Sequence, residues 1–217
     1  LPEGLSPRQS MIVGTAGLTA MLSVLALEEH GVGPDAGDVV VTGASGGAGS
    51  IAVALLGSLG YAPVASPGST EAPAYLRALG AARIVPRSAF ADAPARPMDA
   101  GTWAGAIDAA GGDTLATILS QVQRHGSVAA FGNAGGHALH TSVLPFILRG
   151  VNLLGIDSNT CPNARRRMAW ERLADLLTDA DYERIHAETI ALDAIPEAAR
   201  RIVEGEVQGR ILVDVAA

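Results

Sequence analysis

Short uninterrupted hydrophobic runs alternate along the chain with segments whose apolar residues recur at helical spacing. Residues 38–42 contain three consecutive valines, which predicts a strand buried on both faces. Residues 46–59 carry isoleucine and leucine at helical spacing and end at a glycine, which predicts a helix. Similar patterns predict strands at 61–66, 83–85, 104–109, 127–131 and 151–157, with helices at 72–79 and 114–123. This alternation is typical of an α/β fold of the Rossmann type, a doubly wound parallel sheet of six strands.

The two ends of the chain differ in texture from this middle part. A helix is predicted from residue 10 to about residue 30, and a charged amphipathic helix at 165–177. Beyond it we expect a strand at 189–192, a helix at 195–203 and a last strand at 210–215. We therefore divide the chain into an entry segment with a connecting helix (1–34), a dinucleotide-binding Rossmann domain (35–160), and C-terminal helices with a return strand (161–217).

Composition narrows the classes of partner. With 48% hydrophobic and 17% charged residues the chain is typical of a packed globular protein, and its net charge of −7 argues against a nucleic-acid partner. The uncharged stretch 11–27 contains glycines, threonines and a serine and is short for a membrane span, so we expect a buried helix and no membrane association. A single cysteine, Cys161, excludes an intrachain disulfide and favours a reducing, cytoplasmic compartment. His137 and His140 lack an evident third ligand, so no metal is expected.

The sequence TGASGGAG at residues 42–49 carries the clearest chemistry. It follows a predicted buried strand and begins a predicted helix, as a dinucleotide-binding turn does. Gly46 and Gly47 remove Cβ atoms where a phosphate approaches the positively polarised helix N-terminus, and Gly49 lets helix and strand pack closely. Ala44 stands where the fingerprint usually has its first glycine.

The same segment fits two dehydrogenase superfamilies. It matches the TGxxxGxG pattern of short-chain dehydrogenases and also the glycine turn of medium-chain quinone and enoyl reductases. Short-chain enzymes need a Tyr-x-x-x-Lys pair, in which the lysine lowers the tyrosine pKa. All 15 basic residues of this chain are arginine, so that pair is absent, and the P-loop lysine is absent too. The medium-chain interpretation remains.

Five further segments support it: MIVGTAGLTAML, WAGAIDAAGG, VAAFGNAGG, TSVLPFILRGVNLLGIDS and VQGRILVDV. In this order they resemble the zinc-free, quinone-oxidoreductase-like acryloyl-CoA reductase branch of the medium-chain dehydrogenase/reductase superfamily. The resemblance implies a domain that binds NADPH, a reaction on an activated C=C bond, and a homodimer joined at the sixth strand. It also implies that the chain is the coenzyme domain without the N-terminal GroES-like domain of such enzymes.

The resemblance also implies contacts with each part of the coenzyme. The diphosphate would lie against Ser45, Gly46, Gly47 and Ala48. The adenosine ribose would lie against Pro67, Gly68 and Ser69, and the adenine and its phosphate against Arg87. The nicotinamide half would be lined by Asn133, Ile147 and Ser158, although Ile147 also suits a core position and Ser158 a helix cap.

One departure from the branch bears on coenzyme choice. The branch usually has Ser-Gly-Arg where this chain has residues 67–69, Pro-Gly-Ser, and often asparagine where Glu204 or Gly205 stands. The second strand ends in Ser66 instead of the acidic residue that would bind a free ribose hydroxyl, and Arg87 and Arg77 follow it. These residues favour NADPH over NADH.

Three functions are compatible with these residues. The first is NADPH-dependent reduction of an enoyl thioester such as acryloyl-CoA. The second is reduction of a quinone or another enone on the same fold. The third is a non-catalytic NAD(P)-binding module. No residue can be assigned to catalysis from the sequence.

Overall fold

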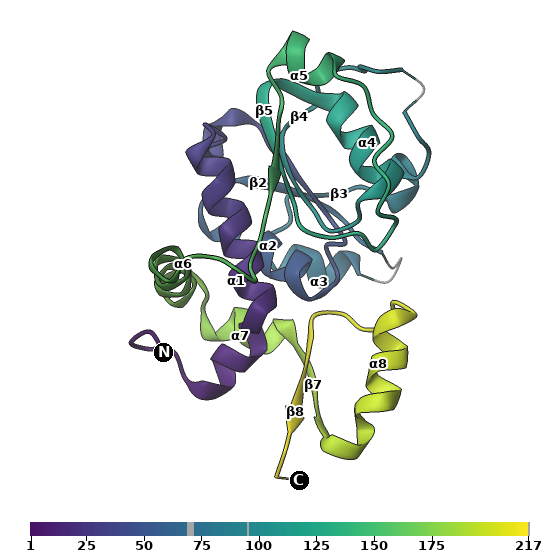
Figure 1. Ribbon diagram of the computed structural model, residues 1–217. Coiled ribbons are helices and arrows are strands. Elements are labelled where there is room, and N and C mark those ends of the chain that lie inside the picture. The colour runs from purple at the N-terminus through teal and green to yellow at the C-terminus, as the bar shows by residue number, and fades with distance from the viewer. Residues whose placement is uncertain (69–71, 95, 217) are drawn as a thin grey trace.

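The protein is described here by a computed structural model that covers residues 1–68, 72–94 and 96–216 (Figure 1). Its helices are α1 (Pro7–Glu29), α2 (Gly47–Ser58), α3 (Pro73–Ala78), α4 (Gly112–Gln121), α5 (Leu144–Arg149), α6 (Asn163–Leu176), α7 (Asp179–Ile185) and α8 (Ile195–Val203). Its strands are β1 (Asp38–Thr42), β2 (Ala62–Ser66), β3 (Arg83–Ile84), β4 (Trp103–Asp108), β5 (Val122–Ala130), β6 (Asn152–Gly155), β7 (His186–Ala191) and β8 (Arg210–Asp214).

The first six strands form one parallel sheet in the order β3-β2-β1-β4-β5-β6. This order confirms the predicted doubly wound α/β fold of the Rossmann type. The strand order reverses between β1 and β4, whose residues Val41 and Ile107 pair. The connections that follow these two strands lead to opposite sides of this point in the strand order. They leave a crevice at the carboxyl ends of β1 and β4.

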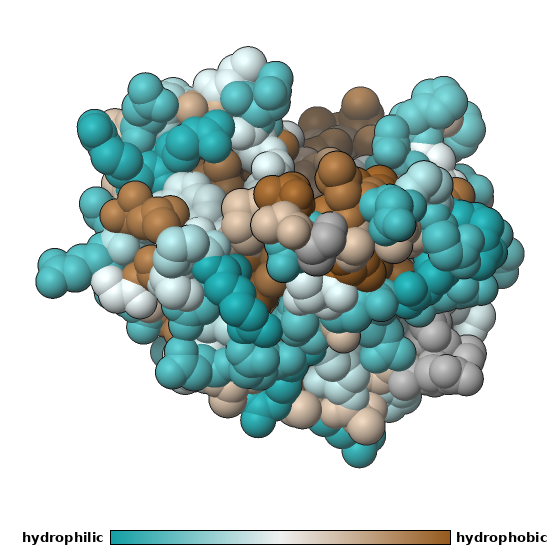
Figure 2. Space-filling view, turned by 90° about the horizontal axis from the view of Figure 1, so that it is seen from below, coloured by the Kyte–Doolittle hydropathy of each residue, from teal (hydrophilic) through white to brown (hydrophobic). Residues whose placement is uncertain are grey.

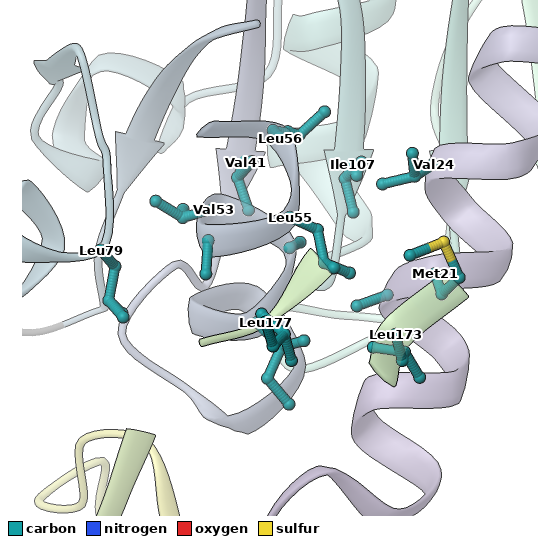
Figure 3. Close-up of a cluster of buried hydrophobic side chains, with 14 of the residues drawn as sticks. Met21, Val24, Val41, Val53, Leu55, Leu56, Leu79, Ile107, Leu173 and Leu177 are labelled. Atoms are coloured by element: carbon teal, nitrogen blue, oxygen red, sulfur yellow. The ribbon is translucent and has the colours of Figure 1, made fainter. Parts of the chain in front are cut away.

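The larger hydrophobic cluster lies where α1 and α2 pack on the sheet. Val41 of β1, Leu55 of α2, Ile107 of β4, and Met21 of α1 are all fully buried in it, and Leu173 of α6 joins them (Figure 3). A second cluster, which includes Leu119 of α4, also contains residues of the sheet. The larger cluster contains residues from all three predicted ranges of the chain, 1–34, 35–160 and 161–217. The boundaries between these ranges stay a prediction.

Helix α1 is the one helix among the described residues that is long and apolar enough to cross a membrane by length and composition. In the fold, 78% of its most apolar window is buried inside the protein. It is kinked at Gly14, whose φ of 47° is not helical. The helix packs chiefly against α2 and α6, as the prediction of a buried helix requires.

The structure corrects the sequence-based elements at several places. Helices α5 and α7, of six and seven residues, were not predicted. Strand β5 begins at Val122 instead of residue 127, and α4 correspondingly ends at Gln121. The register against β4 shifts there, and His125 has a φ of 63°, so this start lacks regular strand pairing.

The C-terminal strands β7 and β8 form a separate two-stranded parallel sheet beside α8 (Figure 1). Several apolar side chains of this part are exposed: Leu192, Ile195, Ile202, Val203, Val213 and Val215. Figure 2 views the molecule from below, the side on which these elements lie in Figure 1, and shows hydrophobic patches among hydrophilic residues. The return strand predicted at 210–215 is therefore present as β8, paired with a strand that begins earlier than predicted.

An ion pair on the outside of the core gives a first testable prediction. Arg165 of α6 donates two hydrogen bonds, of 2.6 and 2.9 Å, to the carboxylate of Glu29 at the end of α1, which lowers the pKa of Glu29. We expect Arg165→Gln to lower the free energy of unfolding at pH 7 by about 0.5–1 kcal/mol, since the pair is partly exposed.

The pH dependence of this loss follows from the direction of the shift. A lowered folded-state pKa stabilises the protein above the unfolded pKa of about 4.3, and this stabilisation is lost as the pH falls through the folded pKa. Urea denaturation should therefore show a larger wild-type advantage at pH 7 than at pH 3. Arg167→Gln, an exposed neighbour on the same helix, is the control. An equal difference at both pH values would contradict the prediction.

Candidate functional site

The glycine turn connects β1 to α2 at the crevice in the sheet. Gly46 is the N-cap of α2 and its N–H donates to the Gly43 carbonyl at 2.9 Å, while no side chain caps the helix. A Cβ on Gly49 would stand 2.2 Å from the Gly43 carbonyl oxygen. This contact leaves no room for a side chain, so Gly49 lets helix and strand end pack closely, as the sequence predicts. The free N–H groups at the start of α2 form a site suited to an anion.

A hollow of about 890 Å³ opens in front of this turn. It is bounded by the end of β2, the start of α4 and the segment that leads into β8. The exposed Arg87, which follows β3, also lines it. Of the residues predicted to contact a coenzyme, the hollow brings together Ser45, Gly46, Gly47, Ala48, Pro67, Gly68 and Arg87.

The other predicted site residues lie apart from this hollow. Asn133 lines a second hollow of about 600 Å³, with His137 and Asp157. Ile147 lies on α5 and is 67% exposed, so the core position considered for it is wrong. Ser158 accepts a hydrogen bond from Arg166 at its carbonyl oxygen, and α6 begins after Pro162 without a side-chain cap, so the cap considered for Ser158 is also wrong. Ser69 lies outside the described residues.

A buried hydrogen-bonded pair holds the strand ends beneath the site. Asp108, fully buried at the end of β4, accepts a hydrogen bond from the Thr42 hydroxyl at 2.7 Å and one from the Gly111 N–H at 2.8 Å. The Thr42 oxygen in turn accepts the Ala109 N–H at 2.9 Å. Burial raises the pKa of Asp108, and these hydrogen bonds oppose that change. The carboxyl therefore connects β1, β4 and the following turn, which is a structural role.

The C-terminal segment contributes contacts that sequence reasoning missed. The Gly209 N–H donates to the Ser45 carbonyl at 2.9 Å, and Arg210 lines the hollow beside Gly47. Glu204 and Gly205, where the branch often has asparagine, line it too. The only signal in the sequence was the segment VQGRILVDV, and nothing in its local pattern places it beside residues 45–47.

Two further predictions from the sequence concern His137 and His140, where no metal is expected, and Arg77, which is counted among the residues that favour NADPH. Among the described residues, no three His, Cys, Asp or Glu side chains gather where they could hold a metal ion. His140 lies 4.0 Å from Asp113, and His137 lies in the second hollow. Arg77 is exposed on α3 and does not line the first hollow.

The matched protein family agrees with this architecture. The family described as zinc-binding dehydrogenase matches residues 47–179, which run from the start of α2 into α7. The chain belongs to the zinc-binding dehydrogenase family. Despite the name of the family, the described residues of this chain contain no group of His, Cys, Asp or Glu side chains that could hold a zinc ion.

Curated relatives align with nearly all of the chain. The acrylyl-CoA reductase AcuI of Ruegeria pomeroyi is 51% identical over 218 residues, which cover 100% of this chain and 66% of that protein. The probable acrylyl-CoA reductase AcuI of Escherichia coli is 50% identical over 99% of this chain and 65% of its own length. The putative quinone oxidoreductase YhfP of Bacillus subtilis is 44% identical over 98% of this chain and 64% of its own length. The chain thus spans less than two thirds of these relatives.

Solved structures superpose closely. YhdH of Escherichia coli with bound NADPH is 50% identical with a TM-score of 0.96, over 99% of this chain and 66% of that one. YhfP of Bacillus subtilis with bound NAD is 44% identical with a TM-score of 0.94, over 99% of this chain and 65% of that one. This member of the zinc-binding dehydrogenase family therefore shares its fold with proteins crystallised with NADPH or with NAD.

Proposed function

We propose that this chain is the NADPH-binding part of an oxidoreductase that reduces the C=C bond of an enoyl thioester such as acryloyl-CoA. One observation carries the coenzyme part of the proposal. The uncapped N-terminus of α2, with glycines at its first turn, opens into a hollow large enough to take a nucleotide. The two acrylyl-CoA reductase relatives, about half identical to this chain, support the substrate.

The preference for NADPH rests on the adenosine end of the hollow. Ser66 ends β2 at the position where an acidic residue would bind a free ribose hydroxyl. Arg87 lines the same end and has no ion-pair partner among the described residues. Its guanidinium is available for a 2′-phosphate, which NADPH has and NADH lacks. Because YhfP was crystallised with NAD, family membership alone does not choose between them.

Coenzyme titration tests this preference. We expect NADPH to bind about tenfold or more tightly than NADH, the size of one charge-assisted contact. Arg87→Gln should remove most of the difference by weakening NADPH and leaving NADH unchanged, measured by fluorescence titration. Arg77→Gln is the matched control, because Arg77 is exposed and outside the hollow. Equal affinity of the wild-type protein for both coenzymes would contradict the assignment of Arg87.

In the proposed reaction, NADPH when bound supplies the hydride that is added to the β-carbon of the enoyl thioester. This chain's residues bind the coenzyme and hold its orientation. Asn133 lines the second hollow, and we propose that this hollow takes the nicotinamide half of the coenzyme. The α-carbon takes up a proton when the hydride adds, so that hydride and proton together saturate the C=C bond.

Substrate choice is tested by measuring turnover with the protein expressed at its natural full length. NADPH oxidation that depends on acryloyl-CoA supports the proposal, and its absence refutes it. The 44% identity to a putative quinone oxidoreductase favours a second candidate, reduction of a quinone or enone. Faster turnover of small quinones than of enoyl thioesters would support that candidate. Tight NADPH binding without turnover of either class would support a non-catalytic module.

We also propose a cytoplasmic homodimer joined at β6. This strand is one of the two edge strands of the sheet, and Leu153 on it is 37% exposed. Exposed apolar side chains on α5, Ile147 and Leu148, add to the apolar surface of this part of the chain. An unpaired edge of this kind favours pairing with a second copy. Sedimentation measurements on the complete protein decide between monomer and dimer.

A further inference from the structure

The loop that leads from β6 to α6 (Figure 1), residues 156–162, borders the second hollow. Its first two residues, Ile156 and Asp157, line that hollow. The Ile156 N–H donates to the Ala130 carbonyl at 3.0 Å and so continues the pairing of β5 with β6 one residue beyond the strand. From Asp157 onward the chain leaves the sheet, and α6 begins at Asn163. The shape of this side of the hollow therefore depends on how the loop is held.

Asp157 folds the loop by accepting hydrogen bonds from residues that follow it. One carboxylate oxygen accepts the Asn159 N–H at 2.8 Å and the Thr160 N–H at 3.0 Å, and the other accepts the Thr160 hydroxyl. The Thr160 hydroxyl and these two N–H groups lower the pKa of Asp157, so its carboxyl is ionised at neutral pH. An aspartate that bonds the main chain two and three residues further on stabilises a turn.

Arg166 of α6 holds the same loop from its other end. Its Nη2 donates to the Ser158 carbonyl at 2.9 Å. Within the described part of the chain, neither Arg166 nor Asp157 takes part in an ion pair. The hydrogen bonds of both charged side chains are thus with the loop itself.

The opposite side of the second hollow, the turn after β5, is built differently. There the Gly135 N–H donates to the Ala110 carbonyl at 2.7 Å. A Cβ on Gly132 would stand 2.2 Å from the Ala109 carbonyl oxygen, so this turn is also closely packed. In the loop after β6, by contrast, no bond between main-chain groups involves residues 157–161, as far as the structure describes the chain. The hydrogen bonds that hold this side involve the two charged side chains.

We propose that Asp157 and Arg166 are positioning residues for the nicotinamide end of the coenzyme, an inference that rests on the proposed NADPH site. Together they fix the main chain of residues 156–158, where the loop meets the second hollow. A nicotinamide ring in that hollow lies against this main chain, and neither charged side chain has to touch it. A loop that is already ordered saves the free energy that ordering it on binding would cost.

The effect of both side chains should be confined to one end of the coenzyme. Residues of this loop line the second hollow, and none of them lines the first, where Arg87 lies at the adenosine end. Loss of Asp157 or Arg166 should therefore weaken binding of the nicotinamide half and leave binding of the adenosine half unchanged. A residue that only stabilised the fold would affect both halves or neither.

The experiment compares NADPH with adenosine 2′,5′-bisphosphate, which lacks the nicotinamide, in the protein at its natural full length. We expect Asp157→Ala to weaken NADPH about three- to tenfold, as the loss of such hydrogen bonds does, and to leave adenosine 2′,5′-bisphosphate unchanged. The fluorescence of bound NADPH should shift toward its value in water, because the dihydronicotinamide ring is held less firmly. Asp175→Ala, which removes an exposed carboxylate near the far end of α6, is the control and should change none of these values.

Three further variants sharpen the comparison. The amide oxygen of Asp157→Asn can still accept the N–H groups of the loop, so its NADPH affinity and fluorescence should lie closer to wild type than those of Asp157→Ala. Arg166→Ala should act in the same direction as Asp157→Ala, whereas Arg167→Ala, at an exposed neighbour, should not. Thermal melting checks folding. If Asp157→Ala does not fold, Arg166→Ala decides the question by the same comparison.

The outcomes separate the inference from the function beneath it. If the wild-type protein binds no NADPH, the proposed coenzyme site is refuted and this inference with it. If the wild type binds NADPH and both alanine variants, at positions 157 and 166, bind it equally well with unchanged fluorescence, only the positioning role is overturned. Equal weakening of NADPH and adenosine 2′,5′-bisphosphate would likewise overturn it, because it would show a general loss of structure.

Discussion

Replacing Gly49 by alanine should lower the free energy of unfolding by about 3 kcal/mol, at the upper end of the cost of overpacking. The added Cβ would stand 2.2 Å from the Gly43 carbonyl oxygen and 2.8 Å from Cα of Ala44. Both are backbone atoms, so no rotation of a flexible side chain relieves the overlap. Either α2 or the turn has to move, and the N–H groups that face the hollow move with it. Urea denaturation and NADPH titration of the variant measure the two effects.

A matched glycine in the same helix provides the control. A Cβ on Gly57 would meet its nearest atom, Cα of Gly80, at 3.4 Å, an ordinary contact. Gly57→Ala should therefore leave the free energy of unfolding within about 1 kcal/mol of wild type or raise it, because alanine favours helix. It should leave NADPH affinity unchanged. Equal stability of Gly49→Ala and Gly57→Ala would show that the turn is not packed as described.

Replacing Asp108 by alanine should be nearly as damaging, with a loss of about 3 kcal/mol in the free energy of unfolding. The carboxyl is fully buried and accepts hydrogen bonds from the Thr42 hydroxyl and the Gly111 N–H. Its removal leaves these donors without a partner away from water, which costs more than the loss of an exposed hydrogen bond. Ala109 and Ala110 follow it and line the hollow, so NADPH binding should weaken as well.

The control for this prediction is Asp38, the first residue of β1. Asp38 forms an ion pair with Arg83, and the side chains of both are substantially exposed. Asp38→Ala should cost less than about 1 kcal/mol, as exposed pairs do, and leave NADPH affinity unchanged. Chemical denaturation of both variants, with far-UV circular dichroism to confirm folding, makes the comparison. A cost for Asp108→Ala no larger than that for Asp38→Ala would contradict the role assigned to the buried carboxyl.

Local patterns accounted for the elements that surround the glycine turn. The consecutive valines of β1 are buried on both faces, and the apolar residues of α2 at helical spacing do pack on the sheet. The missed helix α7 has seven residues, and a capping box of Thr178 and Asp181 marks its start. A helix of two turns shows too few apolar repeats for a periodicity, so only its cap could have indicated it.

The core position considered for Ile147 and the helix cap considered for Ser158 were wrong because residue type alone does not decide exposure or capping. An isoleucine within an apolar stretch suits a core position, but α5 presents it to solvent at 67% exposure. A serine near a helix start suits a cap, yet α6 begins after Pro162. Residue type gives the preference of a side chain, whereas exposure depends on which neighbouring elements pack over it.

By itself, the sequence determined the order of strands and helices, the glycine turn at the end of β1, and the exclusion of chemistry that needs lysine. These follow from local spacing and from composition. Only the tertiary structure decided that Gly209 is bonded to Ser45 and that Arg210 lies beside Gly47. The physical reason is that such contacts join segments far apart in the chain, and they form only when β8 packs back against the start of α2.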